Sequence, residues 1–218
     1  MVTYRISQLP VASPIQLKTW HSVPNGLLYW DPNFIDNDQA EALFGALRDQ
    51  VRWRSDEITL FGKTMPIPRL QAWYGDASYR YSNLTMEPDP WLPILLDLKS
   101  QCENVTNGEQ VANARFNSVL ANLYRDGSDS NGWHSDNEPE LGSQPVIASI
   151  SLGETRTFHL KHKQTKQKYT FDLNSGSLLI MAGEMQKYWL HTVPKTKKPK
   201  TERINLTYRL ISDSSLFT

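Results

Sequence analysis

Apolar residues recur at helical spacing in two segments of the first half of the chain. In the first segment, over residues 36–51, they are Ala40, Leu43, Phe44, Leu47 and Val51. Either Asp36 or Asp38 is placed to cap its N-terminus. In the second segment, which begins at Asp89-Pro90 and ends at Asn107-Gly108, they are Trp91, Leu95, Leu98, Cys102 and Val105. The pattern predicts two amphipathic helices.

From residue 116 onward the period of the pattern changes to that of β-strands. Apolar residues alternate with polar ones or form short apolar runs in seven segments, 116–125, 145–152, 155–163, 167–173, 177–182, 188–193 and 203–212. Turn residues such as Asn174-Ser175-Gly176 separate them. Seven short strands at this spacing predict a closed or double-sheet β architecture.

The region before residue 116 has a less regular pattern. Residues 1–25 have no sustained period and predict an extended lead-in, while residues 26–30 predict a strand. Residues 52–81 predict hairpins and loops, with Leu60-Phe61-Gly62-Lys63 at one hairpin tip. We therefore expect one compact domain made of the lead-in 1–25, an N-terminal extension 26–115 with both helices, and a β core over 116–212.

Two of the predicted strands have one polar face and one apolar face. In the last strand Arg203, Asn205, Thr207 and Arg209 share a face, opposite Ile204, Leu206, Tyr208 and Leu210. In the first strand of the core, Asn122 and Tyr124 lie opposite Val119, Ala121 and Leu123. Guanidinium groups inside a barrel are costly unless an anion pairs with them, and a small dicarboxylate suits two arginines. The alternative is an exposed polar face paired with surface acids.

The composition is that of an ordinary globular protein. Lys plus Arg equals Asp plus Glu at 23 each, and 39% of the residues are hydrophobic. Attraction to nucleic acid must therefore come from local patches. Two lysine clusters, at residues 161–168 and 195–200, suit phosphate contacts, and solvated lysine-rich loops are the alternative.

The single cysteine, Cys102, excludes an internal disulfide and occupies a core-facing helical position. No run of 18 apolar residues and no secretory leader is evident. We expect a monomer with no membrane association, in the cytoplasm, or in the nucleus if the source has one.

The segment from Gly132 to Glu138 contains a candidate metal site. On an extended strand His134 and Asp136 would point to the same face, and His191 from a distant strand would complete two histidines and one carboxylate. This facial set holds Fe(II) and leaves the opposite positions open. A chance H-x-D occurs roughly 0.3 times in such a chain, so the motif needs support. His21, His159 and His162 are expected to be strand or surface residues.

Together these motifs resemble a known enzyme family. The order Asn122-x-Tyr124, His134-x-Asp136, His191 and Arg203-x-Asn205-x-Thr207-x-Arg209 is similar to that of the AlkB-type Fe(II)/2-oxoglutarate dioxygenases, which repair alkylated nucleic acids. The last motif would occur by chance in roughly two chains per thousand. The likeness runs from about residue 60 to 210. Its first part, including Pro68-Arg69 and Tyr74-Gly75-Asp76, is similar to the subgroup that acts on duplex DNA.

The resemblance implies a fold and a cofactor set. The fold is α+β and mainly β, a double-stranded β-helix or jelly roll with the N-terminal helices packed on the sheet. Iron is held by His134, Asp136 and His191, with 2-oxoglutarate and O2 as co-substrates. Arg203 pairs with the distal carboxylate of 2-oxoglutarate, helped by Tyr124. The rest of the cradle is Asn122, Asn205, Thr207 and Arg209.

The resemblance also implies a substrate. The reaction is oxidative demethylation of 1-methyladenine and 3-methylcytosine in DNA, with RNA as an alternative, and it yields formaldehyde, succinate and CO2. The flipped base stacks between His134 and Tyr81, near Tyr79, and Glu138 accepts a hydrogen bond from its exocyclic amine. Phe61 at the hairpin tip fills the space that the base leaves, although a core position for Phe61 is the alternative.

Two points of the substrate assignment depend on other signals. Arg69 lies in a stretch that interleaves tyrosine and arginine, which suits base stacking and phosphate pairing, while a tyrosine-rich sheet is the alternative. Asn137 stands where the family usually has an acid. Other readings are a dioxygenase acting on a protein side chain or small molecule, and a jelly-roll binding module without iron.

Overall fold

The main body of the protein is a pair of antiparallel sheets packed face to face. The computed structural model describes residues 15–60, 63–76, 79–81, 84–108, 111 and 114–212. The larger sheet has seven strands in the order β1 (Trp20–Val23), β2 (Gly26–Asp31), β13 (Ser177–Ala182), β10 (Ile147–Gly153), β15 (Arg203–Arg209), β8 (Ser118–Tyr124) and β5 (Leu70–Gly75). The smaller has four, β12 (Lys168–Leu173), β11 (Arg156–His162), β14 (Trp189–Val193) and β9 (Asn131–His134). The predicted jelly roll is confirmed.

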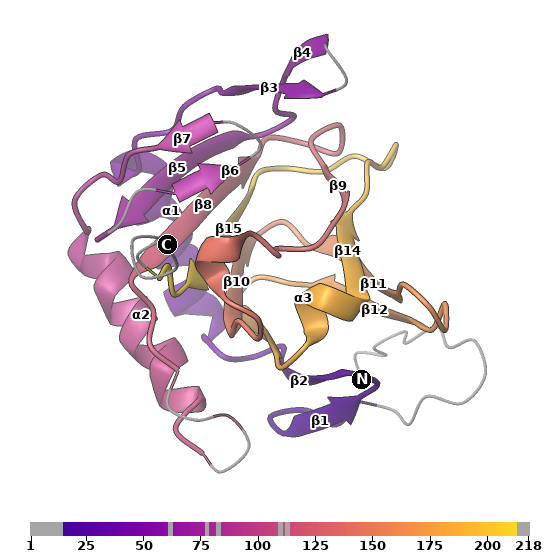
Figure 1. Ribbon diagram of the computed structural model, residues 1–218. Helices are drawn as coiled ribbons and strands as arrows, with labels where there is room; N and C mark the ends of the chain where they lie inside the picture. Colours follow the sequence, from indigo (N-terminus) through magenta and orange to yellow (C-terminus); the bar gives the residue numbers. More distant parts are fainter. Residues whose placement is uncertain are drawn as a thin grey trace.

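The N-terminal half is built into the larger sheet rather than set beside it. Strand β1 lies within the predicted lead-in and pairs with β2, which in turn pairs with β13. At the other edge β5 pairs with β8. Two further hairpins, β3 (Glu57–Leu60) with β4 (Lys63–Pro66) and β6 (Tyr79–Tyr81) with β7 (Leu84–Met86), lie near this edge (Figure 1).

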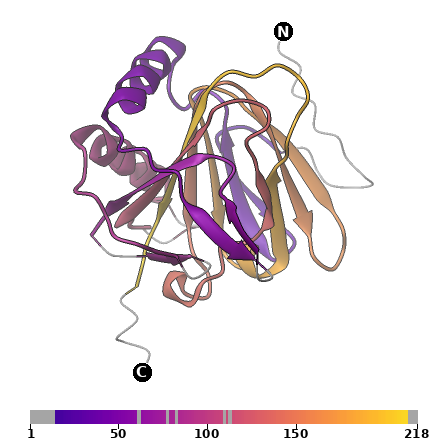
Figure 2. The same ribbon diagram turned by 90° about the horizontal axis from the view of Figure 1, so that it is seen from above.

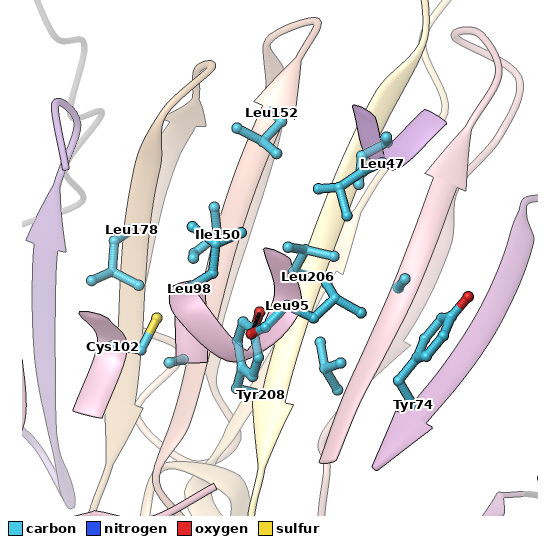
Figure 3. Close-up of a cluster of buried hydrophobic side chains, with 14 of the residues drawn as sticks. Leu47, Tyr74, Leu95, Leu98, Cys102, Ile150, Leu152, Leu178, Leu206 and Tyr208 are labelled. Atoms are coloured by element: carbon cyan, nitrogen blue, oxygen red, sulfur yellow. Dashed lines mark hydrogen bonds between the residues drawn. The ribbon is translucent and has the colours of Figure 1, made fainter. Parts of the chain in front are cut away.

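Helices α1 (Asn37–Gln50) and α2 (Pro93–Val105) cover the face of the larger sheet that points away from the smaller sheet (Figures 1 and 2). Their apolar stripes meet the apolar residues of the sheet in one core, which Figure 3 shows around Leu95, Leu98, Ile150, Leu206 and Tyr208. Cys102 lies in this core, as predicted, and burial raises the pKa of its thiol. The helices therefore seal one face of the sheet against water.

A second core fills the space between the two sheets. It includes Leu28, Trp30 and Leu179 from the larger sheet and Phe158 and Trp189 from the smaller one. In the strands β8, β10 and β15, by contrast, the residues that face this space are largely polar. The space between the sheets is thus lined by apolar residues at one end and by polar residues at the other, and the polar end contains the candidate site.

The two predicted helices form, but the second begins later than expected. Asp36 caps α1 and accepts a hydrogen bond from the Gln39 N–H at 2.9 Å. Asp89 does not cap α2, because its carboxylate pairs with Arg52 and Arg54. The helix instead has Pro93 at its first position and ends at Val105.

Two short helical segments were not predicted from the sequence, the 3₁₀ helix η1 (Pro139–Leu141) and α3 (Met185–Tyr188). Among the described segments, no helix is long and apolar enough to span a bilayer.

Candidate metal centre and its cavity

The three residues of the predicted metal site come together between the sheets. His134 is the last residue of β9 and pairs directly opposite His191 of the neighbouring strand β14. Asp136 follows two residues later, and one possible ligand atom from each of the three side chains lies within 4.8 Å of the others. This is the spacing that a single cation needs from two imidazoles and a carboxylate.

Asp136 reaches the site by a different route from the one predicted. Strand β9 ends at His134, so Asp136 lies in the following loop and not on a continuous strand. Its backbone N–H donates to the side-chain carbonyl of Gln186 at 3.0 Å, from α3. The loop is therefore held by a helix that the sequence pattern did not predict.

Hydrogen bonds around the cluster orient the atoms that face its centre. His134 Nδ1 lies 2.8 Å from the Gly132 carbonyl, a contact that assigns the proton to Nδ1 and leaves the lone pair on Nε2, which lies 3.2 Å from Asn131 Nδ2. Arg209 donates to Asp136 Oδ2 from Nε at 3.1 Å and from Nη2 at 2.6 Å. The other oxygen, Oδ1, faces the histidine Nε2 atoms at 3.5 Å for His134 and 3.8 Å for His191. One carboxylate oxygen is thus held by Arg209 while the other points to the centre.

The surroundings keep each of these groups in its metal-binding protonation state. Burial lowers the pKa of His191 to about 3 and also lowers the pKa of His134. Burial alone would raise the pKa of Asp136, but the charge and hydrogen bonds of Arg209 act against burial, and that pKa lies well below its usual range. Two neutral imidazoles and one carboxylate are the forms that bind a divalent metal.

The metal cluster opens into a cavity that also contains the predicted anion-binding residues. Its lining includes His134, Asp136, His191, Asn122, Tyr124, Arg203, Asn205, Thr207 and Arg209, with Phe158, Leu173 and Met181 on its apolar side. Strand pairing explains this grouping, because Asn205 lies opposite Asn122 and Arg203 opposite Tyr124 in the β15–β8 register. The polar faces predicted for the two strands thus lie side by side and line the same cavity.

Arg203 is the most unusual group in the cavity. The residue is 1% exposed, and its guanidinium donates from Nη2 to the Ser151 hydroxyl at 2.8 Å. Nε and Nη1 are buried with no hydrogen-bond partner in the described part of the chain. Burial lowers the pKa of Arg203 to about 10, although Tyr124 opposes that shift. Two buried donors without acceptors indicate a place for an anion.

The other predicted cradle residues are more fully engaged with the protein. Asn122 Oδ1 accepts from Arg69 Nε at 2.7 Å and from Gln71 Nε2 at 3.0 Å. Asn205 donates to the Ser149 hydroxyl and the Ile150 carbonyl, and accepts from Thr207. These contacts fix the shape of the cavity wall around Arg203.

The predicted substrate residues divide into those that the structure describes and those that it does not. Phe61 lies outside the described residues, although the flanking strands β3 and β4 do form the expected hairpin. Tyr79 and Tyr81 form β6, for which only the backbone is described. Glu138 is half-buried and immediately precedes η1, and Asn137 is exposed.

The interleaved tyrosines and arginines include two corrections. Arg69 is buried and donates to Asn122 and to the Ser130 carbonyl, so its guanidinium does not reach the surface where a phosphate would lie. Tyr74 is also buried, and its hydroxyl accepts from the Arg52 N–H at 3.0 Å. For these two residues the interpretation as nucleic-acid contacts is wrong, and the alternative of a tyrosine-rich sheet describes them better.

Several residues of the site were missed by the sequence analysis. Ser149 and Ser151 alternate on β10 and bond Asn205 and Arg203, so strand alternation could have identified them. Gln186 and Arg156 gave no local signal, because their contacts lie far away in sequence. His159 and His162 lie on β11, as expected; His162 is buried, and its Nε2 lies 3.2 Å from Asn25 Oδ1.

Comparison with known proteins identifies relatives over most of the chain. The family model described as the 2OG-Fe(II) oxygenase superfamily matches residues 27–209. The alpha-ketoglutarate-dependent dioxygenase alkB homolog 3 of Mus musculus is 44% identical over 190 residues, covering 83% of this chain and 64% of that protein. The DNA oxidative demethylase ALKBH2 of Homo sapiens is 37% identical over 186 residues, covering 79% of this chain and 69% of that protein. The chain thus spans slightly less than two thirds of the mouse protein.

Solved structures show the same fold at low sequence identity. The structure of OsALKBH1 has a TM-score of 0.57 at 20% identity and covers 88% of this chain and 100% of that chain. A Pseudomonas putida prolyl-4-hydroxylase has a TM-score of 0.57 at 14% identity, covering 85% of this chain and 92% of that chain.

Proposed function

Because the chain belongs to the 2OG-Fe(II) oxygenase superfamily, we propose that it is an Fe(II)- and 2-oxoglutarate-dependent dioxygenase that demethylates alkylated DNA. The proposed substrates are 1-methyladenine and 3-methylcytosine, and the products are formaldehyde, succinate and CO2. The two AlkB homologues confirm the family resemblance, and the human one is named a DNA oxidative demethylase. That name supports the choice of DNA over a protein or small-molecule substrate.

One observation carries the proposal. The candidate metal ligands line the same cavity as the buried Arg203, two of whose donors lack acceptors among the described residues. A co-substrate that chelates a metal at one end and carries a carboxylate at the other would satisfy both. 2-Oxoglutarate has this chemistry, so the residues present fit the cofactor pair that the superfamily uses.

The residues of the chain have separate tasks in this proposal. His134, Asp136 and His191 would hold Fe(II) on one face, and Arg209 would keep Asp136 bound through a single oxygen. Arg203 would take the distal carboxylate of 2-oxoglutarate. When bound, iron with 2-oxoglutarate and O2 supplies the oxidation that hydroxylates an N-methyl group, after which the base loses formaldehyde. Phe158, Leu173 and Met181 would exclude water from this end of the cavity.

Surface charge supports a nucleic-acid substrate. Lys166 and Lys168 are exposed near the turn between β11 and β12, and Lys195, Lys197 and Lys198 are exposed in the segment after β14. Since the strand β14 carries His191, the second cluster lies close to the metal site in the chain. Cations so placed on a protein of zero formal net charge would attract the phosphate backbone locally.

The segment that follows the β3–β4 hairpin is hydrogen-bonded to the strand that leads to the metal site. The Ser130 N–H donates to the Pro68 carbonyl at 3.0 Å, and Arg69 Nη1 donates to the Ser130 carbonyl at 3.1 Å. Ser130 immediately precedes β9, the strand that ends at His134. This connection supports a role for the hairpin in presenting a nucleobase to the metal, with Phe61 as the residue proposed to fill the space that the nucleobase leaves. Tyr79, Tyr81 and Glu138 remain the proposed contacts of that base.

The test is reconstitution without O2, using Fe(II) and 2-oxoglutarate, followed by exposure to air with an oligonucleotide. The oligonucleotide carries 1-methyladenine or 3-methylcytosine, as single-stranded DNA, duplex DNA or single-stranded RNA, and the unmethylated sequence is the control. We expect mass spectrometry to show loss of the methyl group from DNA with one succinate formed per methyl removed.

Two other outcomes would overturn parts of the proposal. Succinate formed without demethylation of any oligonucleotide would keep the dioxygenase and exclude the nucleic-acid substrate. Faster demethylation of RNA than of either DNA would change the substrate class.

A further inference from the structure

Arg156 is a buried arginine that the proposed chemistry does not use. It is the first residue of β11, and 2% of its surface is exposed. Its guanidinium donates three hydrogen bonds, to the carbonyls of Asp126 at 3.0 Å, Asp129 at 2.8 Å and Pro194 at 2.7 Å. Burying a cation that bonds only to carbonyl oxygens costs desolvation free energy that an apolar residue would avoid. The presence of an arginine here therefore suggests a specific role.

These three carbonyls belong to the two connections that flank the metal-binding strands. Asp126 and Asp129 lie in the loop before β9, and Pro194 follows β14 directly. The loops also touch each other, because the Thr196 N–H donates to the Gly127 carbonyl at 2.9 Å. A Cβ on Gly127 would lie 2.6 Å from the Thr196 carbonyl oxygen, so only glycine permits this approach. Arg156 therefore fastens both loops at the same end of the cavity.

The same guanidinium packs against the floor of the cavity. Its central carbon lies 5.6 Å from the centroid of the Tyr124 ring. The guanidinium of Arg203 lies 5.0 Å from that centroid. Tyr124 is 2% exposed and lines the cavity, so a single buried phenol ring contacts two cations. Each contact is favourable for the ring, but the two positive charges repel each other.

The charge of Arg156 is not cancelled by a direct ion pair in the portion of the chain that is described. Its hydrogen bonds go to carbonyls, and the nearby Asp129 carboxylate is instead held by Arg125 through its backbone N–H, Nε and Nη2. The positive charge of Arg156 also contributes to the lowered pKa of Arg203. The carboxylates of Asp126, Asp129 and Glu154 attract Arg156 without forming a direct ion pair, so they offset its positive charge beside Tyr124 only in part.

We propose that Arg156 is a positioning residue for the co-substrate, acting through Tyr124 on Arg203. It holds the Tyr124 ring against the Arg203 guanidinium, and its charge strengthens the attraction of the cavity floor for a distal carboxylate. The inference rests on the proposed function only for the identity of the co-substrate, and it requires no particular nucleic acid. It predicts that Arg156 distinguishes a dicarboxylate from a monocarboxylate.

A plain structural role makes a different prediction. If Arg156 only fastens the loops, its loss would loosen β9 and β14, and every ligand of the cavity would bind less well. If it acts on Arg203, only ligands with a distal carboxylate would lose affinity. 2-Oxoglutarate and 2-oxopentanoate separate the two cases, because they share the same chain length and metal-chelating end and differ in the distal carboxylate.

The experiment measures binding by calorimetry with the Mn(II)-loaded full chain, which does not turn over. For Arg156→Gln we expect the Kd of 2-oxoglutarate to rise about tenfold, the size of one lost charge interaction of about 1.4 kcal/mol. The Kd of 2-oxopentanoate should change less than twofold. Arg156→Lys, which keeps the charge, should bind 2-oxoglutarate within about threefold of the unchanged protein. Thr157→Ala, at the next position of the same strand, is the matched control.

Three results bear on the inference. Equal losses of affinity for both keto acids, or an unchanged Kd for 2-oxoglutarate, would overturn it. If Arg156→Gln fails to fold, Arg156→Met, which also removes the charge, takes its place in a double-mutant cycle with Tyr124→Leu. Additive effects of these two substitutions on the Kd of 2-oxoglutarate would exclude action through the ring. Failure of the unchanged protein to bind 2-oxoglutarate would instead overturn the proposed function, so the two failures are distinguishable.

Discussion

The two faces of β15 are both buried, but in different ways. On the helix side Ile204, Leu206 and Tyr208 are fully buried against α1 and α2. On the cavity side the buried residues are Arg203, Asn205, Thr207 and Arg209. Apolar burial stabilises the first face at about 25 cal/mol per Å². The second face costs free energy wherever a polar atom lacks a partner, as at Arg203.

The comparison indicates a division of labour within one sheet. The helix side provides stability, since its side chains need nothing from outside the protein. On the cavity side, the polar groups find all their partners only when a metal and an anion bind. The interactions of this face therefore contribute to ligand affinity rather than to the stability of the ligand-free protein. Substitutions on the two faces should therefore separate stability from function.

The largest expected effect is on the cavity side. His134→Ala should abolish turnover, because two remaining ligands do not hold Fe(II) firmly in the facial arrangement. The free energy of unfolding of the metal-free protein should change by less than about 1 kcal/mol, since His134 is half-buried. Succinate assays and denaturant unfolding measure the two quantities. His159→Ala, on the outer part of the same small sheet, is the control and should retain full turnover.

Replacing Asp136 should lower stability as well as turnover, whereas replacing His134 should lower turnover alone. Its carboxylate pairs with Arg209 in a buried position. Asp136→Ala would remove the partner of a buried charge and cost about 3–5 kcal/mol of stability in addition to activity. Metal-free His134→Ala and Asp136→Ala proteins of equal stability would show that the Arg209 pair contributes nothing to the fold.

The next effect lies on the helix side. Leu206→Ala should lower the free energy of unfolding by about 2–5 kcal/mol, because it removes a side chain that is 0% exposed and leaves a cavity under the helices. Leu210→Ala, just past the end of the same strand where the leucine is 46% exposed, should change it by less than about 0.5 kcal/mol. The Kd of 2-oxoglutarate for folded Leu206→Ala should stay unchanged. A large rise in this Kd would show that packing on the helix side is coupled to ligand binding on the cavity side.

Much of this division could be predicted from the sequence. The period of two in residues 203–209 assigned each side chain to its correct face, because alternation in a strand is a local property. The helix over 36–51 was also predicted from a local property, the helical spacing of its apolar residues, with Asp36 as one of two candidate caps. The family resemblance predicted that the metal ligands and Arg203 share one site, and they do line one cavity, although Asp136 lies in the loop after β9.

The remaining features depend on contacts that no local pattern records. Asp89 has a strong capping signature, but two arginines 35 and 37 residues away take its carboxylate. Arg69 looked suited to a phosphate, yet Asn122, 53 residues further along, holds it inside the protein. Arg156 gave no signal because its partners are backbone carbonyls of distant loops. In each case long-range pairing overrode the local chemistry.

A third substitution on the cavity side tests whether the polar groups that bind ligands there lower the stability of the ligand-free protein. Arg203→Met nearly keeps the side-chain volume and removes a buried charge, two of whose donors have no partner in the part of the chain that the structure describes. The metal-free protein should be as stable as before, or more stable by about 1–3 kcal/mol. The Kd of 2-oxoglutarate should rise about a hundredfold, or about 2.7 kcal/mol. Arg48→Met, which removes a half-exposed ion pair with Glu202, is the control and should affect neither quantity strongly. A less stable Arg203→Met protein would show that these polar groups do not lower that stability.

The smallest effect concerns the end of α1, far from the cavity. Asp36→Ala removes the side chain that accepts the Gln39 N–H and should cost about 1 kcal/mol of unfolding free energy. Asp38→Ala, in the first turn but not at the cap, should cost less than about 0.5 kcal/mol through the helix dipole. Thermal unfolding of both variants measures the difference. Because the helix side serves stability alone, turnover and the Kd of 2-oxoglutarate should be unchanged in both. A loss of affinity in Asp36→Ala would mean that the packing of α1 on the sheet also sets the shape of the cavity, and the division between the faces would fail.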